Sequence, residues 1–396
     1  MELLRNAVRP YAWGSRTIIA TMLGRAVPAP HPEAELWIGA HPGDSSVVAG
    51  SGRPLVDVIA EDPAGQLGSG VATRWDGRLP FLLKVLAAEE PLSLQAHPSP
   101  EQAAAGFARE EAAGIPRDAP NRNYPDPTAK PELICALSEF HALAGFGDPH
   151  RTVKLLRSVE TPGLAPYVDL LAGQPNSAGL RALFTTWITL PQPALDKLEA
   201  ELLDACVTHV RDHGEFELEC RTILQLGEAY PGDAGVLVAL LLNRVVLAPG
   251  EAIFLPAGNL HSYLQGACVE ILANSDNILR GGFTPKHVDV PELLRILDFS
   301  CGDMPLLGGD PERGRCVYRA GAAEFELSRI ELKTEEVRID GGLPRILLCT
   351  EGALGTGSLT LRRGESCWVP ASDPALVLRA IDDAPAQAFV ATVGTL

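Results

Sequence analysis

The sequence lacks any Cys-x-x-Cys pair and any Cys that stands near a His at the spacing of a zinc finger. Its eight cysteines are scattered singly along 396 residues, which argues against a thiolate metal site. We therefore expect reduced, mostly buried thiols in a cytosolic protein. They are Cys135, Cys206, Cys220, Cys268, Cys301, Cys316, Cys349 and Cys367.

Long apolar runs and an excess of positive charge are also missing. The longest apolar run, residues 234–242, is far shorter than the roughly 20 residues of a membrane-spanning helix. Residues 1–15 lack the apolar segment and cleavage site of a signal peptide. The formal net charge of −17 argues against nucleic acid as a partner, although it permits a local basic pocket. We predict a soluble, cytoplasmic protein, by default a monomer, that acts on a small molecule and binds neither nucleic acid nor membrane.

The length, the composition and the pattern of apolar residues indicate a folded chain of two or three domains. Hydrophobic residues make up 46% and charged residues 21%, which is ordinary for a protein with a sizeable core. Short β-like runs at 36–38, 46–48 and 81–86 are typical of an all-β domain and predict one in the first hundred residues. Ser99, Pro100 and Gln102 predict a capped helix over residues 100–113. Apolar residues at helical spacing predict an inserted helical domain over 148–228.

A short internal repeat suggests two related β-barrels. Residues 250–257 read Gly-Glu, four strand-like residues and Pro-Ala, and residues 364–371 follow the same pattern. The first copy continues to His261, whereas the second has no His. The sequence thus predicts a mainly β, α+β fold. A metal-binding barrel comprises 1–147 and 229–300, the helical insertion 148–228, and a degenerate, metal-free barrel 301–396.

Residues 91–97 alternate between apolar and polar side chains, as a strand with one buried face does. Ser93, Gln95 and His97 share the polar face, and such a row is costly to bury unless it lines a cavity or binds something. Same-face neighbours lie about 6.7 Å apart, so Gln95 and His97 can converge on one ion between them. Taken alone, this pattern favours a solvated edge strand in which Gln and His occur by chance.

Two further motifs favour a metal site. Residues 250–261 read Gly-x5-Pro-x-Gly-x2-His and resemble the second motif of cupin barrels, although Gln265 replaces the usual Asn. Pro131 stands beside Glu132 and can fix its carboxylate rigidly. Two imidazoles, one carboxylate and one amide oxygen suit zinc or a similar divalent ion. These ligands carry one negative charge in total, so a divalent ion leaves the site with a net positive charge, as in a catalytic metal site.

Seven strings resemble type I mannose-6-phosphate isomerases, a family of the cupin superfamily, and they follow the family's order over residues 1–300. They lie at 11–14, 35–42, 80–86, 91–98, 130–132, 255–261 and 273–286. The departures are mild: Gly281 replaces the family's more frequent Ala, and Ser262 replaces another Ala. The C-terminal hundred residues fit only as a generic second barrel.

The resemblance implies a zinc enzyme, with one ion per chain, that interconverts mannose 6-phosphate and fructose 6-phosphate through a cis-enediol. Arg280 matches the family's catalytic arginine, and Lys130 and Glu270 are both plausible proton-shuttling bases. The positions implied as zinc ligands are Gln95, His97, Glu132 and His261. Those implied to contact the sugar phosphate are Ser93, Tyr263 and Lys286.

Without the resemblance, simpler interpretations hold for each residue. Lys130 and Lys286 are then surface charges, Arg280 pairs with Asp276, and Glu270 is a solvated strand residue. His41, Tyr11 and Trp13 are expected to be structural. Two rival functions stay open: an iron-dependent cupin oxygenase, and a sugar-binding bicupin whose metal is structural.

Overall fold

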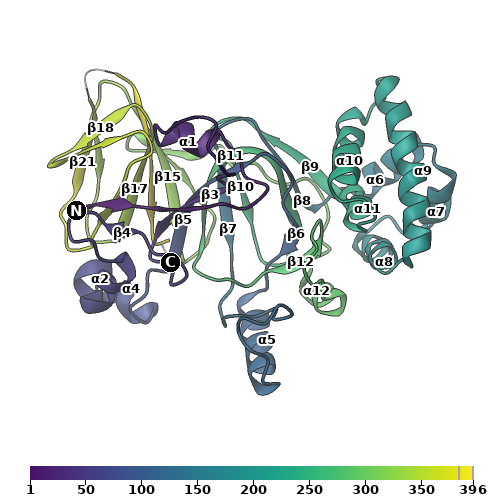
Figure 1. The fold of residues 1–396 in the computed structure, drawn as a ribbon, viewed down its shortest axis with the longest axis horizontal. Helices are drawn as coiled ribbons and strands as arrows, with labels where there is room; N and C mark the ends of the chain where they lie inside the picture. Colours follow the sequence, from purple (N-terminus) through teal and green to yellow (C-terminus); the bar gives the residue numbers. More distant parts are fainter. Residues whose placement is uncertain (382–383, 395–396) are drawn as a thin grey trace.

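The computed structural model describes residues 1–381 and 384–394, which form a mixed α+β fold of antiparallel sheets and helices. Figure 1 shows two β regions side by side, with a lobe of helices beyond the second of them. The N-terminus and β22 (Ala386–Thr392) both belong to the first β region, on the left of the view. The predicted α+β combination of strands and helices is therefore present, with helices and strands in comparable amounts rather than mainly strands.

The β region beside the helical lobe is organised around one long strand, β11 (His261–Ala273). Its C-terminal part pairs with β5 (Phe81–Ala88) and β7 (Glu132–Ala136). Its N-terminal part pairs with β6 (Leu94–Ala96) and β8 (Phe140–Phe146). The outer strands are β2 (Ala7–Arg9), β3 (Glu35–Gly39), β9 (Leu242–Leu247), β10 (Ala252–Leu255) and β12 (Leu279–Gly282).

Strand β11 bends sharply between its two parts. The register with β8 shifts between Tyr263 and Gln265, and Gly266 adopts a φ of +114°. A side chain on Gly266 would lie 2.5 Å from the carbonyl oxygen of Glu139, so only glycine fits this bend. The bend turns both halves of one strand around the same space.

The other β region consists of an eight-stranded and a four-stranded sheet. Apolar side chains that include Leu347, Leu354 and Leu378 pack together in its core. The large sheet contains, in order, β13 (Asp310–Glu312), β14 (Arg315–Tyr318), β15 (Glu326–Leu332), β22 (Ala386–Thr392), β17 (Arg345–Glu351), β20 (Ser366–Val369), β1 (Glu2–Arg5) and β4 (Val47–Val48). The small sheet contains β16 (Val337–Ile339), β21 (Leu376–Ala380), β18 (Ala353–Thr356) and β19 (Leu359–Arg362).

The internal repeat forms the same turn twice. Gly250 and Gly364 have φ values of +89° and +84°. Glu251 and Glu365 each accept a 2.8 Å hydrogen bond from the backbone N–H three residues earlier. Strands β10 and β20 follow directly. The two copies are thus equivalent in local structure as well as in sequence.

The expected helices form close to their predicted bounds. Ser99 accepts from the N–H of Gln102 in a complete capping box that starts α5 (Pro100–Ala112). Asp148 caps α6 (Pro149–Ser158). The lobe continues through η1 (Pro162–Leu164), α7 (Ala165–Gly173), α8 (Ser177–Ile188), α9 (Gln192–Arg211), α10 (Glu217–Ala229), α11 (Gly235–Val238) and η2 (Ala239–Leu241).

The expectation that residues 1–98 are purely β is wrong in two stretches, at residues 18–22 and 55–74. The second stretch holds three short helices, α2 (Leu55–Glu61), α3 (Pro63–Leu67) and α4 (Ser69–Arg74). The carboxylate of Asp62 accepts from the N–H of Gly65, and Pro63 occupies the first turn. Two other short helices are α1 (Ile18–Met22) and α12 (Val290–Ile296).

The cysteines are free thiols, six of them buried, with Cys301 exposed and Cys316 half-buried. The expectation that most of the thiols are buried is confirmed. Among the described residues, no helix combines the length and the hydropathy that crossing a bilayer requires.

Candidate active site

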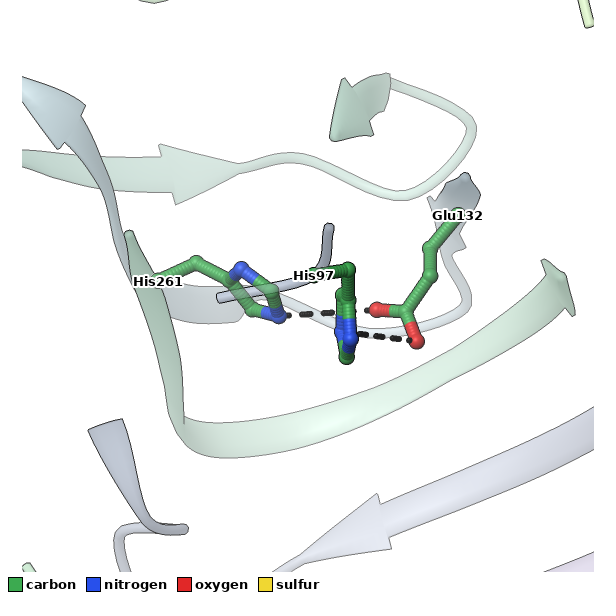
Figure 2. Close-up of side chains that lie close together, drawn as sticks. All are labelled: His97, Glu132 and His261. Carbon is green, nitrogen blue, oxygen red and sulfur yellow. Dashed lines mark ion pairs between the residues drawn. The ribbon is translucent and has the colours of Figure 1, made fainter. Parts of the chain in front are cut away.

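Three of the predicted metal ligands, His97, Glu132 and His261, converge in a buried cluster (Figure 2). Their ligand atoms all lie within 4.8 Å of one another. The Nε2 atom of His97 lies 3.2 Å from Glu132 Oε1, and that of His261 lies 3.5 Å from Glu132 Oε2. Residues separated by up to 164 positions thus meet because β6, β7 and β11 are neighbours in the sheet.

The hydrogen bonds of both histidines direct a lone pair into the cluster. Nδ1 of His97 lies 2.8 Å from the carbonyl oxygen of Asn277, and Nδ1 of His261 lies 3.1 Å from that of Asn259. Each Nδ1 must donate to its carbonyl, so each Nε2 is unprotonated in the neutral ring. Burial lowers the pKa of His97 to about 4, which keeps its imidazole neutral near pH 7.

The cluster therefore consists of groups that accept hydrogen bonds. Both Nε2 atoms are buried, and no donor reaches them from the residues described. Burial opposes ionisation of Glu132, but the nearby Lys130 side chain holds the pKa of this carboxyl well below its usual range. Two lone pairs and a carboxylate facing one another repel unless a cation lies between them. The donor set fits a divalent ion such as zinc.

Gln95 lies in β6 beside this cluster. Its Cα is in register with His261 on one neighbouring strand and with Arg280 on the other. The side chain is half-buried and lines the adjoining pocket. Its role as a fourth ligand stays a prediction.

A cavity of about 480 Å³ adjoins the cluster, and Glu132 forms part of its wall. The β strands and the loop after β12 bring the other predicted site residues to this one cavity. They are Ser93, Gln95, Lys130, Tyr263, Glu270, Arg280 and Lys286. The cavity is thus the single place where the sequence-derived candidates outside the buried histidines meet.

Two cations in this cavity differ in their surroundings. Lys130 Nζ lies 3.1 Å from Oε1 of Glu132, so this lysine is bound to a predicted metal ligand. Arg280 is partly buried, which lowers the pKa of its guanidinium, yet it forms no ion pair with any described residue. Asp276, its suggested partner, lies instead 3.5 Å from Nε2 of His41. Arg280 is therefore available to a ligand.

Lys84 and Glu35 are site residues that the sequence analysis missed. Lys84 in β5 is buried, with Nζ 3.3 Å from Glu270 Oε2 and 3.5 Å from Glu35 Oε1. Burial alone would lower the pKa of Lys84, but the two carboxylates raise it. Trp37 donates from Nε1 to Glu35 at 2.6 Å. The available signal was Lys84 itself, the single charge in an otherwise apolar strand buried along its whole length.

Tyr263 connects the metal cluster with Glu270. Its hydroxyl lies 3.0 Å from Glu270 Oε1 and 3.5 Å from Glu132 Oε2. Burial raises the pKa of the phenol well above its usual value, so the hydroxyl keeps its proton and donates. Burial also raises the pKa of Glu270, against the opposing effect of the Lys84 ammonium.

The remaining residues named from the sequence lie at the edge of the cavity. His41 accepts a 3.0 Å hydrogen bond from the N–H of Gly43 and is outside the metal cluster, as expected of a structural residue. Tyr11 and Trp13 stack with ring centroids 5.7 Å apart. Lys286 is exposed on the loop that follows β12.

Gly258 holds the loop that supports both histidines. Its N–H donates to the carbonyl of His97 at 2.8 Å, its φ is +78°, and an added Cβ would lie 2.8 Å from Asp298 N. We expect Gly258→Ala to lower the free energy of unfolding by about 2 kcal/mol and to weaken metal binding. Denaturant unfolding and competition with a chelator measure both effects. Gly70→Ala, at a helical glycine with open space around it, should leave metal binding unchanged and should not lower the free energy of unfolding; losses equal to those of Gly258→Ala would contradict the assignment.

Fold and site together define a protein that carries a buried nitrogen–oxygen metal site beside a charged pocket. A model of the catalytic domain of type I phosphomannose isomerases matches residues 1–148. Mannose-6-phosphate isomerase of Escherichia coli (strain K12) is 39% identical over 388 residues, which cover 96% of this chain and 97% of that protein. The human mannose-6-phosphate isomerase is 35% identical over 324 residues, covering 75% and 73%.

Solved structures are similar over the whole chain. The mannose 6-phosphate isomerase of Salmonella typhimurium bound to its substrate, fructose 6-phosphate, and to zinc superposes with a TM-score of 0.89. It is 36% identical, and the match covers 100% of both chains. The chain belongs to the type I mannose-6-phosphate isomerase family.

Proposed function

We propose that this protein is a zinc-dependent aldose–ketose isomerase that interconverts mannose 6-phosphate and fructose 6-phosphate. The observation that carries the proposal is the acceptor-only cluster of His97, Glu132 and His261 on the wall of a pocket lined by cations. Membership of the isomerase family supplies the substrate class. The Salmonella relative binds fructose 6-phosphate and zinc in a fold that matches this chain throughout.

Gln95, His97, Glu132 and His261 would hold one zinc ion. When bound, zinc supplies a Lewis acid that stabilises negative charge on a sugar oxygen. The Nδ1–H groups of the histidines, held by the carbonyls of Asn277 and Asn259, fix the ring orientation. The protein thereby prepares the site before substrate arrives.

Proton transfer between C2 of the aldose and C1 of the ketose needs a base inside the pocket. Glu270 is our candidate, because burial raises its pKa towards the working range of a general base. Lys84 and Tyr263 hold its carboxylate from two sides. The carboxylate takes the proton from C2, next to the C1 carbonyl, which leaves a cis-enediolate. The hydroxyl proton of O2 moves to O1, and the Glu270 carboxyl returns its proton to C1 as the carbonyl forms at C2.

Lys130 is the competing candidate for this base. Its Nζ lies 3.1 Å from Glu132 Oε1, which favours a role in binding or in stabilising oxygen charge. We expect Glu270→Gln to lower kcat by about 10³-fold, since an amide cannot take the proton. Exchange of the C2 proton with solvent, measured by NMR, should fall in parallel. If Lys130→Met abolishes that exchange while Glu270→Gln retains it, Lys130 is the base.

Arg280 and Lys286 are assigned to the substrate's charges. Arg280 has no protein partner among the described residues and lies one strand from Gln95, where it can stabilise oxygen charge that develops during the reaction. Lys286 is exposed at the pocket and can pair with the phosphate. Ser93 and Tyr263 complete the proposed substrate contacts.

Lys286→Ala should therefore affect binding more than turnover. We expect KM for mannose 6-phosphate to rise about 10-fold with kcat nearly unchanged, because the phosphate lies far from the reacting carbons. Raising the salt concentration should reduce the difference in KM between the variant and the parent protein. Lys333→Ala, an exposed lysine in the other β region, is the matched control. A drop in kcat with unchanged KM would rule out this assignment.

The same proposal extends to the arrangement of the chain. We propose two cupin-like barrels, one metal-binding (1–147 and 229–300) and one metal-free (301–396), with a helical insertion at 148–228. The equivalent turns at Gly250 and Gly364 support the relationship between the barrels. The pairing of β1 with β20 adds residues from the beginning of the chain to the sheet of the C-terminal barrel. We also propose a cytoplasmic monomer, which agrees with eight free thiols.

The deciding experiment is a coupled assay for fructose 6-phosphate formed from mannose 6-phosphate, with and without a chelator. Activity that the chelator removes and zinc restores supports the proposal. Iron-supported oxygen consumption would favour the oxygenase, and unfolding on metal removal without any isomerase activity would favour a structural metal. Circular dichroism of the metal-free protein separates these last two outcomes.

A further inference from the structure

The helical lobe meets the β region of the candidate site where the start of α11 lies against the end of β12 (Figure 1). A Cβ atom on Gly282, the last residue of β12, would lie 2.9 Å from the Cα of Gly235. A Cβ atom on Gly235, the first residue of α11, would lie 2.9 Å from a ring carbon of Phe283. Glycine at both positions therefore allows the two backbones to approach closely.

The carboxylate of Asp233 joins these two segments. Its Oδ2 accepts a 2.8 Å hydrogen bond from the N–H of Phe283, and its Oδ1 accepts a 2.7 Å hydrogen bond from the N–H of Gly235. Burial raises the pKa of this carboxyl, whereas the backbone N–H groups of Gly235, Thr284 and Phe283 lower it. Because one oxygen holds the start of α11 and the other holds the residue after β12, the carboxylate fixes the two segments relative to each other.

The backbone that follows β12 is strained and depends on such support. Phe283 has a φ of +55°, in the left-handed region that is costly for a residue with a bulky side chain. Its ring is buried, and its centroid lies 5.5 Å from that of Tyr230. The hydroxyl of Tyr230 donates to the carbonyl of Pro91 at 2.6 Å. Residues 230–235 thus hold Phe283 both by its N–H and by its ring.

The turn of residues 230–235 is itself held by α9 of the helical lobe. Glu199 is buried, and its Oε2 accepts a 2.9 Å hydrogen bond from the N–H of Gly232. Gln192 donates from Nε2 to the carbonyl of the same glycine, also at 2.9 Å. The position of Asp233 is therefore set by the helical lobe rather than by the β region whose backbone it holds.

Two residues assigned to the substrate lie on either side of Phe283. Arg280 belongs to β12, whose register with β6 shifts between Arg280 and Gly282, and Lys286 lies in the following loop. Both side chains line the active-site cavity, and Asp233 does not. The positions of the guanidinium and the ammonium group therefore depend on backbone that Asp233 holds from behind the cavity wall.

We propose that Asp233 is a positioning residue for the isomerase reaction, because it anchors the backbone between Arg280 and Lys286 and so sets where both cations stand. This inference rests on the proposed function, which assigns these two side chains to the substrate. Displacing a substrate-holding group by about 1 Å can lower a rate by about 10²-fold. A residue that touches no substrate can therefore have a measurable effect on turnover.

Asp233→Asn is the first test, because it keeps the size of the side chain but leaves one of the two N–H groups without an acceptor. We expect kcat to fall about 10-fold and KM for mannose 6-phosphate to rise about 3-fold, with zinc content unchanged. Asp169→Asn, at an exposed carboxylate of α7 in the same lobe, is the matched control and should behave like the parent protein. Parent-like kinetics of Asp233→Asn would overturn the inference.

A double-mutant cycle separates positioning from a general loss of stability. In the Arg280→Ala background, Asp233→Asn should lower kcat less than about 2-fold, because the guanidinium that it positions is absent. An equal loss of kcat in both backgrounds would show that the substitution acts on the whole fold, and would refute the positioning role.

Hydrogen exchange tests the anchor itself without any substrate. In the zinc-loaded Asp233→Asn protein, amides of residues 280–287 should exchange at least about 3-fold faster than in the parent protein, and those of residues 91–98 should exchange at the parent rate. Mass spectrometry of peptides from the two segments measures both rates. Unchanged exchange in residues 280–287 would show that the carboxylate does not hold this backbone.

Asp233→Ser decides if the asparagine variant does not fold. A serine hydroxyl can still accept from the N–H of Gly235 in a local turn, but it is too short to hold Phe283 as well. The same changes in kcat, KM and exchange are expected. An active parent protein with unaffected Asp233 variants would refute this inference alone, whereas a parent protein without isomerase activity would refute the proposed function and this inference with it.

Discussion

Replacing His261 by alanine is expected to remove the bound zinc and to lower kcat/KM at least about 10³-fold. The imidazole of His261 is buried and its lone pair faces Glu132. No side chain from the protein surface can therefore replace this imidazole as a ligand. Its loss leaves the Glu132 carboxylate with fewer partners in a buried site, which weakens the remaining ligand set. Metal analysis of the purified variant and the coupled isomerase assay measure the two effects.

The control for this variant is His150→Ala, at an exposed histidine near the start of α6. It should keep one zinc ion per chain and full activity. Added zinc should restore the His261 variant only partly, and at concentrations far above those that saturate the parent protein. Retention of stoichiometric zinc by His261→Ala would remove this residue from the ligand set and, with it, the basis of the proposed function.

The second large effect is expected for Arg280→Ala, which should lower kcat about 10²- to 10³-fold while zinc stays bound. The guanidinium has no ion-pair partner in the described protein, so its removal leaves no buried charge behind. The loss should appear mainly in kcat, because charge on the sugar oxygens is greatest in the transition state. Steady-state kinetics, together with metal analysis of the same sample, test the assignment.

Arg280→Lys provides the graded comparison, since it keeps the charge but not the planar donor fork. We expect activity between those of the parent and the alanine variant. Arg74→Ala, at an exposed arginine of α4, should behave like the parent protein. Unchanged turnover in Arg280→Ala would exclude Arg280 from catalysis and leave its pocket position without a catalytic role.

Features set by neighbouring residues could be predicted from the sequence. The capping box of Ser99 and Gln102 defined the start of α5, and Asp148 defined the start of α6. Polar alternation in residues 91–97 located the strand of Gln95, although β6 covers only Leu94–Ala96 and His97 directly follows it. In each case the physical signal lies within a few residues, so a single sequence contains it.

Features set by strand pairing could not be predicted in the same way. Lys84 belongs to the candidate site only because β5 lies beside β11, where Glu270 is opposite it in register. Glu35 enters the site through the next strand, β3. The hydroxyl of Tyr263 bonds to Glu270, a contact that depends on the bend in β11, and its contact with substrate stays a prediction. The pairing of β1 with β20 likewise joins residues more than 360 positions apart.

The bend at Gly266 determines how the site is assembled. In an unbent strand, seven residues would separate the Cα atoms of Tyr263 and Glu270 by about 23 Å, beyond the reach of both side chains. Their observed contact of 3.0 Å requires the strand to bend between them. The bend therefore joins the half of β11 that begins with His261, a proposed metal ligand, to the half that contains Glu270, the proposed base. Changes in loop length elsewhere in the chain therefore do not alter the distance between these two halves of the strand.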